Sequence, residues 1–313
     1  MHAPETKTLT SQLIKADPAS PVLKVIGRDT LVVKAGTSFR GKTFDEDTPV
    51  LLPKGGLVTG ADYVVALSGE AIALRLTHLP DDDSYFGGFH FAPGGNAAAR
   101  AGGDDVPAIN PFSLWDVNFR PACKDPRGMV LIELPAGKFW CDIYLTGADC
   151  HLDGTSKFGA TIADGRDCPI NPATGERFKR FDYAAACAVM AHHGKGLLAT
   201  DEFRAAAEGV TENSAAPRDP NTTGLDAIRT SRFGLMQATG NMWVWGHDGD
   251  PDSPRASLFG GSWIGGDSAG SRYAYVGHWP ENSLDIIGAR GRSDHLQLDE
   301  RCDSSAAGRA RAR

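Results

Sequence analysis

The chain has 313 residues, enough for two domains of ordinary size, and 41% of them are hydrophobic and 23% charged, as is typical of a globular protein. Its formal net charge of −7 argues against nucleic acid as a partner, because phosphate binding needs a basic surface. Residues 1–15 contain no long apolar run, so we expect neither a signal peptide nor membrane insertion.

Short β-branched or apolar runs, separated by turn residues, fill the first part of the chain. They lie at 22–26, 30–34, 50–52, 62–67 and 71–76. Strands this short and this closely spaced predict a small β-sandwich over residues 1–84. We interpret the acidic run Asp81–Asp83 as a solvated linker at the domain boundary. A calcium site is the alternative, although the ligand spacing resembles no calcium loop.

A second domain is predicted over residues 85–300, so the expected fold class is α+β. Strands are expected at 130–134 and 139–145, and helices at 183–193 and 201–208, with Thr200 as the N-cap of the second helix. From residue 234 the pattern changes to short strands, tight turns and tryptophans. Residues 301–313 are basic and rich in small residues, which predicts a disordered tail.

Side chains with potential chemistry are present but are not arranged as a site. The six cysteines form no CxxC pair, which favours free thiols in a reducing cytoplasm, with a Cys150–Cys168 disulfide as the alternative. Adjacent His192 and His193 on a helix point about 100° apart and cannot share one metal ion. Residues 247–252 are acidic, and we interpret them as a turn, with a calcium loop as the alternative.

No motif for a nucleophile, a phosphate-binding loop or a carboxylate pair is found, so we predict no enzyme activity, no catalytic residue, no metal and no cofactor. Trp243, Trp245 and Trp263 lie in glycine-containing blocks and are expected to pack in a core. Arg272 and Arg290 are expected to donate hydrogen bonds to buried carbonyls. Between these anchors lie side chains that share no chemistry, which suggests a displayed surface.

These blocks resemble the C-type lectin-like fold in its formylglycine-generating-enzyme branch. Its "GN.WEW", "GGSW" and "GFR" motifs are similar to residues 240–245, 260–263 and 288–290. The enzymes of that branch need a pair of copper-binding cysteines late in the fold. After Trp245 this chain has only Cys302, so the copper chemistry is missing.

A closer resemblance covers nearly the whole chain. It is to the major tropism determinants, the tail-fibre receptor-binding proteins that phages diversify through a retroelement. The similar segments are collinear and lie at 87–96, 112–116, 119–122, 125–129, 153–157, 161–165, 192–195, 258–261, 270–272 and 288–296. Members of that family start with a β-prism domain, and we expect the similarity here to begin at the β-sandwich that follows it, near Leu13.

The resemblance implies a homotrimer, made in the bacterial cytoplasm and carried on the virion tail fibre beside other virion tail proteins. A variable region at about 255–296 would bind a host-cell surface receptor, either a protein or a glycan. Carried over position by position, the ligand-binding residues are Ser262, Ile264, Gly265, Ser268, Tyr275, Gly277, His278, Asn282, Leu284 and Ile286. The alternatives are a formylglycine-generating-type enzyme and a calcium-dependent sugar-binding lectin.

Overall fold

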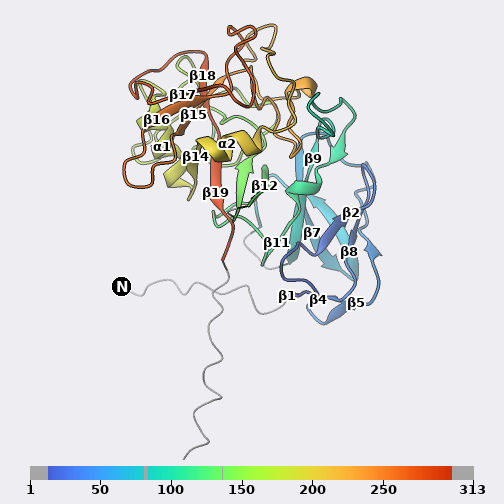
Figure 1. Ribbon diagram of the computed structural model, residues 1–313. Helices are drawn as coiled ribbons and strands as arrows, with labels where there is room; N and C mark the ends of the chain where they lie inside the picture. Colours follow the sequence, from blue (N-terminus) through green and yellow to red (C-terminus); the bar gives the residue numbers. More distant parts are fainter. Residues whose placement is uncertain (1–12, 81–83, 136, 298–313) are drawn as a thin grey trace, which may run out of the picture.

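The computed structural model describes residues 13–80, 84–135 and 137–297 (Figure 1). Within these ranges the fold is mostly β, and its two α-helices are ten and seven residues long. The helical share is smaller than an α+β class leads one to expect, because turns and loops occupy most of the chain between the strands. The predicted basic tail at 301–313 lies outside the described residues.

Three small sheets make up the N-terminal part of the fold. One contains β1 (Leu13–Ile14), β4 (Thr37–Phe39) and β5 (Lys42–Phe44), and another contains β2 (Leu23–Val25), β3 (Leu31–Val33) and β6 (Thr48–Pro49). The third has the order β10 (Ala108–Ile109), β9 (Tyr85–Ala92), β7 (Ala61–Ser68) and β8 (Glu70–Arg75), and β11 (Trp115–Asp116) also pairs with β9.

Strand β9 begins directly after the expected domain boundary at residue 84 and pairs with β7, which precedes that boundary. Tyr63 lies opposite Phe89, and Val65 opposite Gly87. Residues on both sides of 84 therefore belong to one sheet, which sequence patterning does not reveal because it contains no pairing information. The acidic run at 81–83, with its linker and calcium interpretations, lies outside the described residues.

One apolar core joins the small sheets. Phe86 on β9 lies 5.0 Å from the ring of Phe39 on β4 and 6.3 Å from that of Phe44 on β5, measured between ring centroids. Tyr63 and Phe89 stack across the β7–β9 pair at 5.2 Å. Buried aromatic rings contribute large apolar areas, so this core holds β1–β5 and β7–β10 together as one packed unit.

A larger sheet forms the second part of the fold. Its strand order is β12 (Met129–Leu134), β13 (Gly137–Asp142), β19 (Gly291–Asp294), β14 (Gly196–Ala199), β15 (Trp243–His247), β16 (Ala256–Phe259) and β17 (Ala274–Val276), and β18 (Ile287–Ala289) pairs with β15. Because β18 and β19 return to the middle of this sheet, the segments 260–273 and 277–286, on either side of β17, form long loops outside it.

The two helices pack against this sheet. Helix α1 (Tyr183–His192) begins after Asp182, whose carboxylate accepts a hydrogen bond from the Ala185 amide at 3.0 Å. Helix α2 (Thr200–Ala206) includes Thr200 as its first residue, so the prediction of Thr200 as the N-cap is wrong. The carboxylate of Glu202 accepts from the Ala199 amide at 2.9 Å and satisfies the helix start instead.

Buried Arg290 links two distant segments of the second part of the fold through hydrogen bonds to their carbonyls. It is fully buried, and its guanidinium donates to the carbonyls of Asp142 at 2.8 Å, Ile143 at 2.5 Å and Met236 at 2.8 Å. The prediction for Arg290 is confirmed. The same prediction for Arg272 is wrong, because Arg272 is exposed and makes no hydrogen bond to any described residue.

The loops at 260–273 and 277–286, here called the late loops, lie on the opposite side of the fold from the described ends of the chain. In Figure 1, β1 and the end of β19 lie towards the bottom, whereas β17, β18 and the loops around them lie at the top. A binding surface formed by these loops is therefore remote from both described ends.

Candidate functional site

Two tryptophans on β15 form the floor beneath the late loops. Trp245 is fully buried and its indole Nε1 donates to the carbonyl of Phe181 at 3.4 Å. Trp243 is half-buried, and its ring lies 5.2 Å from that of Tyr275 on β17. Trp263, expected to be buried, is only half-buried. The loops after β16 thus rest on a floor that belongs to the core.

Two glycines turn the chain out of β16. Gly260 and Gly261 have φ angles of 89° and 77°, in the left-handed region that favours glycine. A Cβ on Gly261 would lie 2.6 Å from the carbonyl oxygen of Ser268, and one on Gly260 would lie 2.9 Å from the ring of Phe203. Both positions therefore require glycine, which explains the Gly-Gly pair in this block.

The predicted binding residues differ in solvent exposure: some are exposed, some half-buried and one fully buried. The large exposed members are Ile264 at 59%, Tyr275 at 61% and Leu284 at 48%. Ser268 and Gly277 are also exposed, and the half-buried members are Gly265, His278, Asn282 and Ile286. Most of the predicted positions thus present atoms to solvent.

Ser262 departs from the prediction, because it is fully buried. It follows the two left-handed glycines, and the next amide, that of Trp263, donates to the carbonyl of Asn241 at 3.0 Å. This turn holds the Ser262 side chain inside the fold, where its hydroxyl makes no hydrogen bond. Ser262 therefore cannot contact a partner in this conformation.

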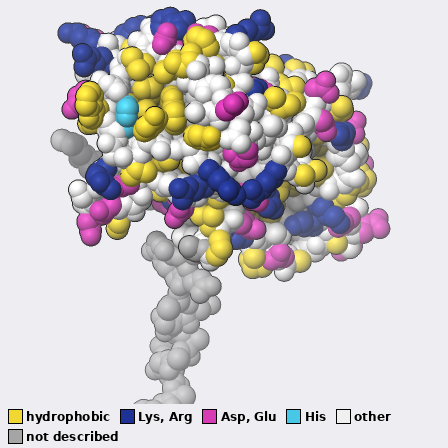
Figure 2. Space-filling view, turned by 45° about the horizontal axis from the view of Figure 1, so that its top comes forward, with side chains coloured by type: hydrophobic (Ala, Val, Ile, Leu, Met, Phe, Trp, Pro, Cys, Tyr) yellow, Lys and Arg dark blue, Asp and Glu magenta, His cyan; other side chains and the backbone are white. Residues whose placement is uncertain are grey.

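Sequence reasoning missed the most exposed large apolar side chain of the region. Trp279 is 75% exposed, and Val276, three residues earlier in the chain, is 51% exposed. The available signal was the position of Trp279 before Pro280, in a turn with no apolar periodicity around it. We call Ile264, Tyr275, Val276, Trp279 and Leu284 the exposed apolar set. Figure 2 shows apolar side chains gathered around a histidine on this side of the molecule.

The side chains around Trp279 hold one another in place. His278 lies 6.0 Å from the Trp245 ring and 6.1 Å from the Tyr275 ring, and its backbone amide donates to the carbonyl of Ala256 at 2.7 Å. Its Nε2 is 2.7 Å from Nδ2 of Asn282. Burial lowers the pKa of His278, so the ring is neutral near pH 7. These contacts hold the His278 and Asn282 side chains in position.

The chain after Trp279 is fixed by hydrogen bonds to distant segments. The amide of Tyr183 donates to the carbonyl of Pro280 at 3.0 Å, and the amide of Gly165 donates to the carbonyl of Leu284 at 3.0 Å. Arg166 pairs with Asp285 at 3.0 Å. A surface loop with such anchors can carry variable side chains without losing its shape.

The acidic run at 247–252 is a turn. Asp248 accepts from the amide of Arg255 at 3.0 Å and from its side-chain Nε at 2.6 Å, and these bonds lower the pKa of Asp248 to about 2. Asp250 accepts from the amide of Asp252 at 3.0 Å. The carboxylates thus bind protein donors, and the described residues contain no group of ligands suited to a metal ion.

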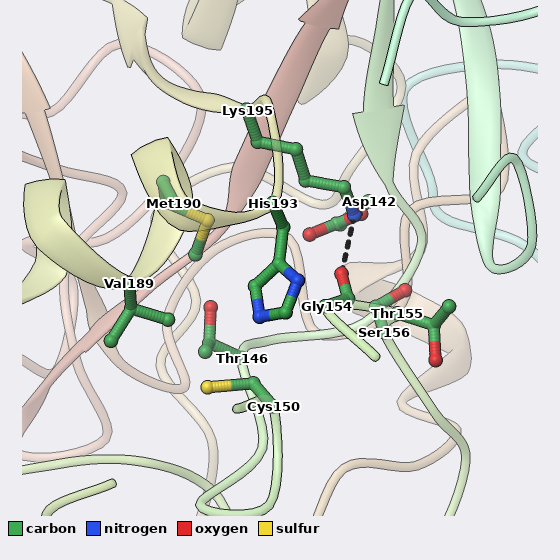
Figure 3. A pocket seen from close by; sticks show the side chains of 10 residues that line it. All are labelled: Asp142, Thr146, Cys150, Gly154, Thr155, Ser156, Val189, Met190, His193 and Lys195. Atoms are coloured by element: carbon green, nitrogen blue, oxygen red, sulfur yellow. Dashed lines mark hydrogen bonds and ion pairs between the residues drawn. The ribbon is translucent and has the colours of Figure 1, made fainter. Parts of the chain in front are cut away.

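The cavity in Figure 3 is where an active site would be sought, because it is lined by Cys150, His193, Lys195 and Asp142. Its volume of about 10 Å³ has room for roughly one water molecule. Burial raises the pKa of the Cys150 thiol to about 12, so the reactive thiolate is absent at neutral pH. The Lys195 ammonium lies 2.6 Å from Asp142 and donates to the carbonyl of Gly154 at 2.7 Å, which are structural contacts.

The described cysteines are free thiols, so the alternative of a Cys150–Cys168 disulfide is wrong. Cys302 lies outside the described residues. His192 is exposed and His193 half-buried, and their rings are nearly perpendicular at 84°, as expected for neighbours on a helix that share no ligand. In the described part of the chain, no helix is both long enough and apolar enough to span a bilayer.

No family model matches this chain. It is 38% identical over 329 aligned positions to the tail fiber receptor-binding protein of Bordetella phage BPP-1, a match that covers 91% of this chain and 85% of that protein. The chain belongs to the major tropism determinant family of phage tail-fibre proteins.

Solved structures of major tropism determinant variants agree with this. The U1 and M1 variants superpose with a TM-score of 0.82 each, at 37% and 38% identity, over 91% and 92% of this chain and 86% of each variant. The I1 variant has the same TM-score at 39% identity, over 91% of this chain and 86% of the variant. Similarity to major tropism determinants fits the C-type lectin-like fold expected from the Trp and Gly blocks.

Proposed function

We propose that this chain is a phage or prophage tail-fibre receptor-binding protein that recognises a host-cell surface ligand through residues 262–286. The named relative is a tail fiber receptor-binding protein, and the match covers most of both chains. The observation that carries the proposal is the exposure of two large aromatic side chains in this region, Trp279 at 75% and Tyr275 at 61%. Exposed apolar clusters on soluble proteins usually mark binding sites.

The arrangement suits a recognition surface. The exposed apolar set offers contact area, and the floor of Trp243 and Trp245 restricts the motion of Tyr275 and His278. Ordered aromatic side chains lose little conformational entropy on binding, as in antibody paratopes. The variable positions in this proposal are those expected from the family resemblance. Among them, Ser262 is buried and does not contact the ligand directly.

Three finer features belong to the same proposal. The chain assembles as a homotrimer on the tail fibre beside other virion proteins, with the late loops facing away from both described ends. Three copies raise the avidity for a cell surface by about 10²–10⁴ over one copy. The N-terminal small sheets form a sandwich-like unit that supports a C-type lectin-like domain, and the protein is a binding module rather than an enzyme.

Binding of the full chain to bacteria tests the proposal. Fluorescently labelled protein is incubated with a panel of bacterial strains, including the host of the phage that encodes it, and the bound protein is counted by flow cytometry. We expect binding to the host strain and inhibition of phage adsorption by excess protein. Equal binding to all strains, or no effect on phage adsorption, would contradict the proposal.

A further inference from the structure

Arg100 lines three adjoining hollows on the surface beside α2. They have volumes of about 470, 310 and 250 Å³. The charged side chains that line them are Arg100, Arg204, Arg232, Arg272, Glu208 and Glu212. Arginines outnumber acids here although the whole chain carries a net charge of −7. The row of hollows is therefore a local basic site on an acidic protein.

The acidic side chains in the row already have partners. Glu208 pairs with Arg232 at 3.1 Å. Glu212 accepts from the amide of Ser271 at 3.0 Å and from its hydroxyl. Arg100 and Arg272 are exposed and form no ion pair with any described residue, although both line the hollows of 310 and 250 Å³. Two guanidinium groups are thus free to bind an external anion.

From this geometry we infer a binding site for the sulfate or carboxylate groups of an acidic polysaccharide, formed by Arg100 and Arg272 with Arg204 at its edge. Guanidinium groups donate two parallel hydrogen bonds to such oxyanions. The arginines that line the hollows outnumber the carboxylates by four to two, and a cleft with such an excess of positive charge attracts anions. The inference goes beyond the proposed function, because these arginines lie outside the predicted variable positions and the exposed apolar set.

The shape of the site favours a polysaccharide over an acidic peptide. Successive hollows that share one arginine can take successive units of a linear polymer with repeated charges. Phe112 lines the first hollow and Tyr273 the second, so an aromatic side chain is available in each for contact with the apolar face of a sugar ring. Tyr273 directly precedes β17, which places the basic row next to the exposed apolar set. In Figure 2, basic side chains form a band beside the apolar ones.

Binding of dextran sulfate to the full chain tests the inference, with uncharged dextran and poly-glutamate as comparison ligands. The test variant is Arg100→Gln with Arg272→Gln. The control is Arg75→Gln with Arg180→Gln, which removes the same charge from exposed arginines outside the hollows. Calorimetry gives the Kd, and a melting temperature for each variant shows that it is folded.

We expect dextran sulfate to bind the unmodified chain more tightly than poly-glutamate, and uncharged dextran not to bind. The test variant should raise the Kd for dextran sulfate by about tenfold or more, and the control by less than about twofold. An unchanged Kd in the test variant, or an equal loss in the control, would overturn the site. If poly-glutamate bound more tightly than dextran sulfate, and the test variant lost that binding, the site would be one for an acidic polypeptide. The proposal of a polysaccharide ligand would then be wrong.

Discussion

The ring of Tyr275 lies 5.2 Å from the ring of Trp243, so an exposed side chain of β17 rests on a half-buried side chain of β15. This contact joins the exposed apolar set to the core of the large sheet. Trp245, two residues along the same strand, supports His278 at 6.0 Å. In the proposed function, the outer layer carries the variable side chains and the inner layer, Trp243 and Trp245, supports them.

The two layers should respond differently to truncation. Trp245→Ala removes a fully buried indole and should lower the free energy of unfolding by about 3–5 kcal/mol through cavity formation. Trp279→Ala, at 75% exposure, is the matched control and should change it by less than about 0.5 kcal/mol. Chemical denaturation measures both. Equal losses in the two variants would mean that Trp279 packs in the core.

Arg290 and Arg272 form a second matched pair. Arg290→Met should lower the free energy of unfolding by more than about 3 kcal/mol, because several buried carbonyls lose their donor. Arg272→Met should change it by less than about 0.5 kcal/mol, since Arg272 is exposed. Thermal and chemical unfolding of both variants provide the comparison. A small effect for Arg290→Met would show that its hydrogen bonds are replaced by other donors.

His295 should make the stability depend on pH. Trp140 Nε1 donates to His295 Nδ1 at 3.0 Å, which requires an unprotonated Nδ1. Burial, aided by Lys138 and Lys15 and opposed by Glu133, lowers the pKa of His295 below its ordinary value of 6.5. The unfolded chain therefore binds the proton more readily, and the contribution of neutral His295 is present above pH 6.5 and lost as the pH falls towards the folded pKa.

The measurement is the free energy of unfolding of the unmodified chain and of His295→Gln across that pH window. The variant keeps a side-chain acceptor but does not titrate, so its profile should be flatter. If the free energy of unfolding changed with pH by the same slope in both proteins, His295 would not contribute to the acid sensitivity.

The oligomeric state is a separate prediction. Multi-angle light scattering of the full chain at micromolar concentration should give three times the chain mass of 33.2 kDa. A monomer at that concentration would remove the avidity argument, because each copy would then bind its ligand alone.

Local sequence patterns were informative wherever an element depends on its own residues. The runs at 62–67 and 130–134 lie within β7 and β12, and the run at 71–76 exceeds β8 by one residue, because short apolar runs between turn residues form strands. The helix prediction at 183–193 agrees with α1 to within one residue. The pairing of β9 with β7 across residue 84 has no local signature, because it depends on which strands meet in space.

Single side chains in the candidate site were harder to predict. Arg272 and Arg290 both follow glycine-containing blocks, yet one is exposed and the other fully buried. Ser262 is a small polar residue that the Gly260–Gly261 turn directs inward. Tryptophan is usually assigned to a core, and only the position of Trp279 in a turn before Pro280 distinguishes it from Trp245. These differences depend on backbone direction, which residue type alone does not give.

Binding to host cells by Tyr275→Ser and Trp279→Ser, measured together with their melting temperatures, tests the central claim most directly. Leu152→Ser is the control, because Leu152 is 69% exposed but lies outside the exposed apolar set. We expect at least one of the two variants to weaken binding by more than about 1 kcal/mol while all three proteins keep the melting temperature of the unmodified chain. Unchanged cell binding in both variants, or an equal loss in Leu152→Ser, would contradict the assignment of this surface to receptor recognition.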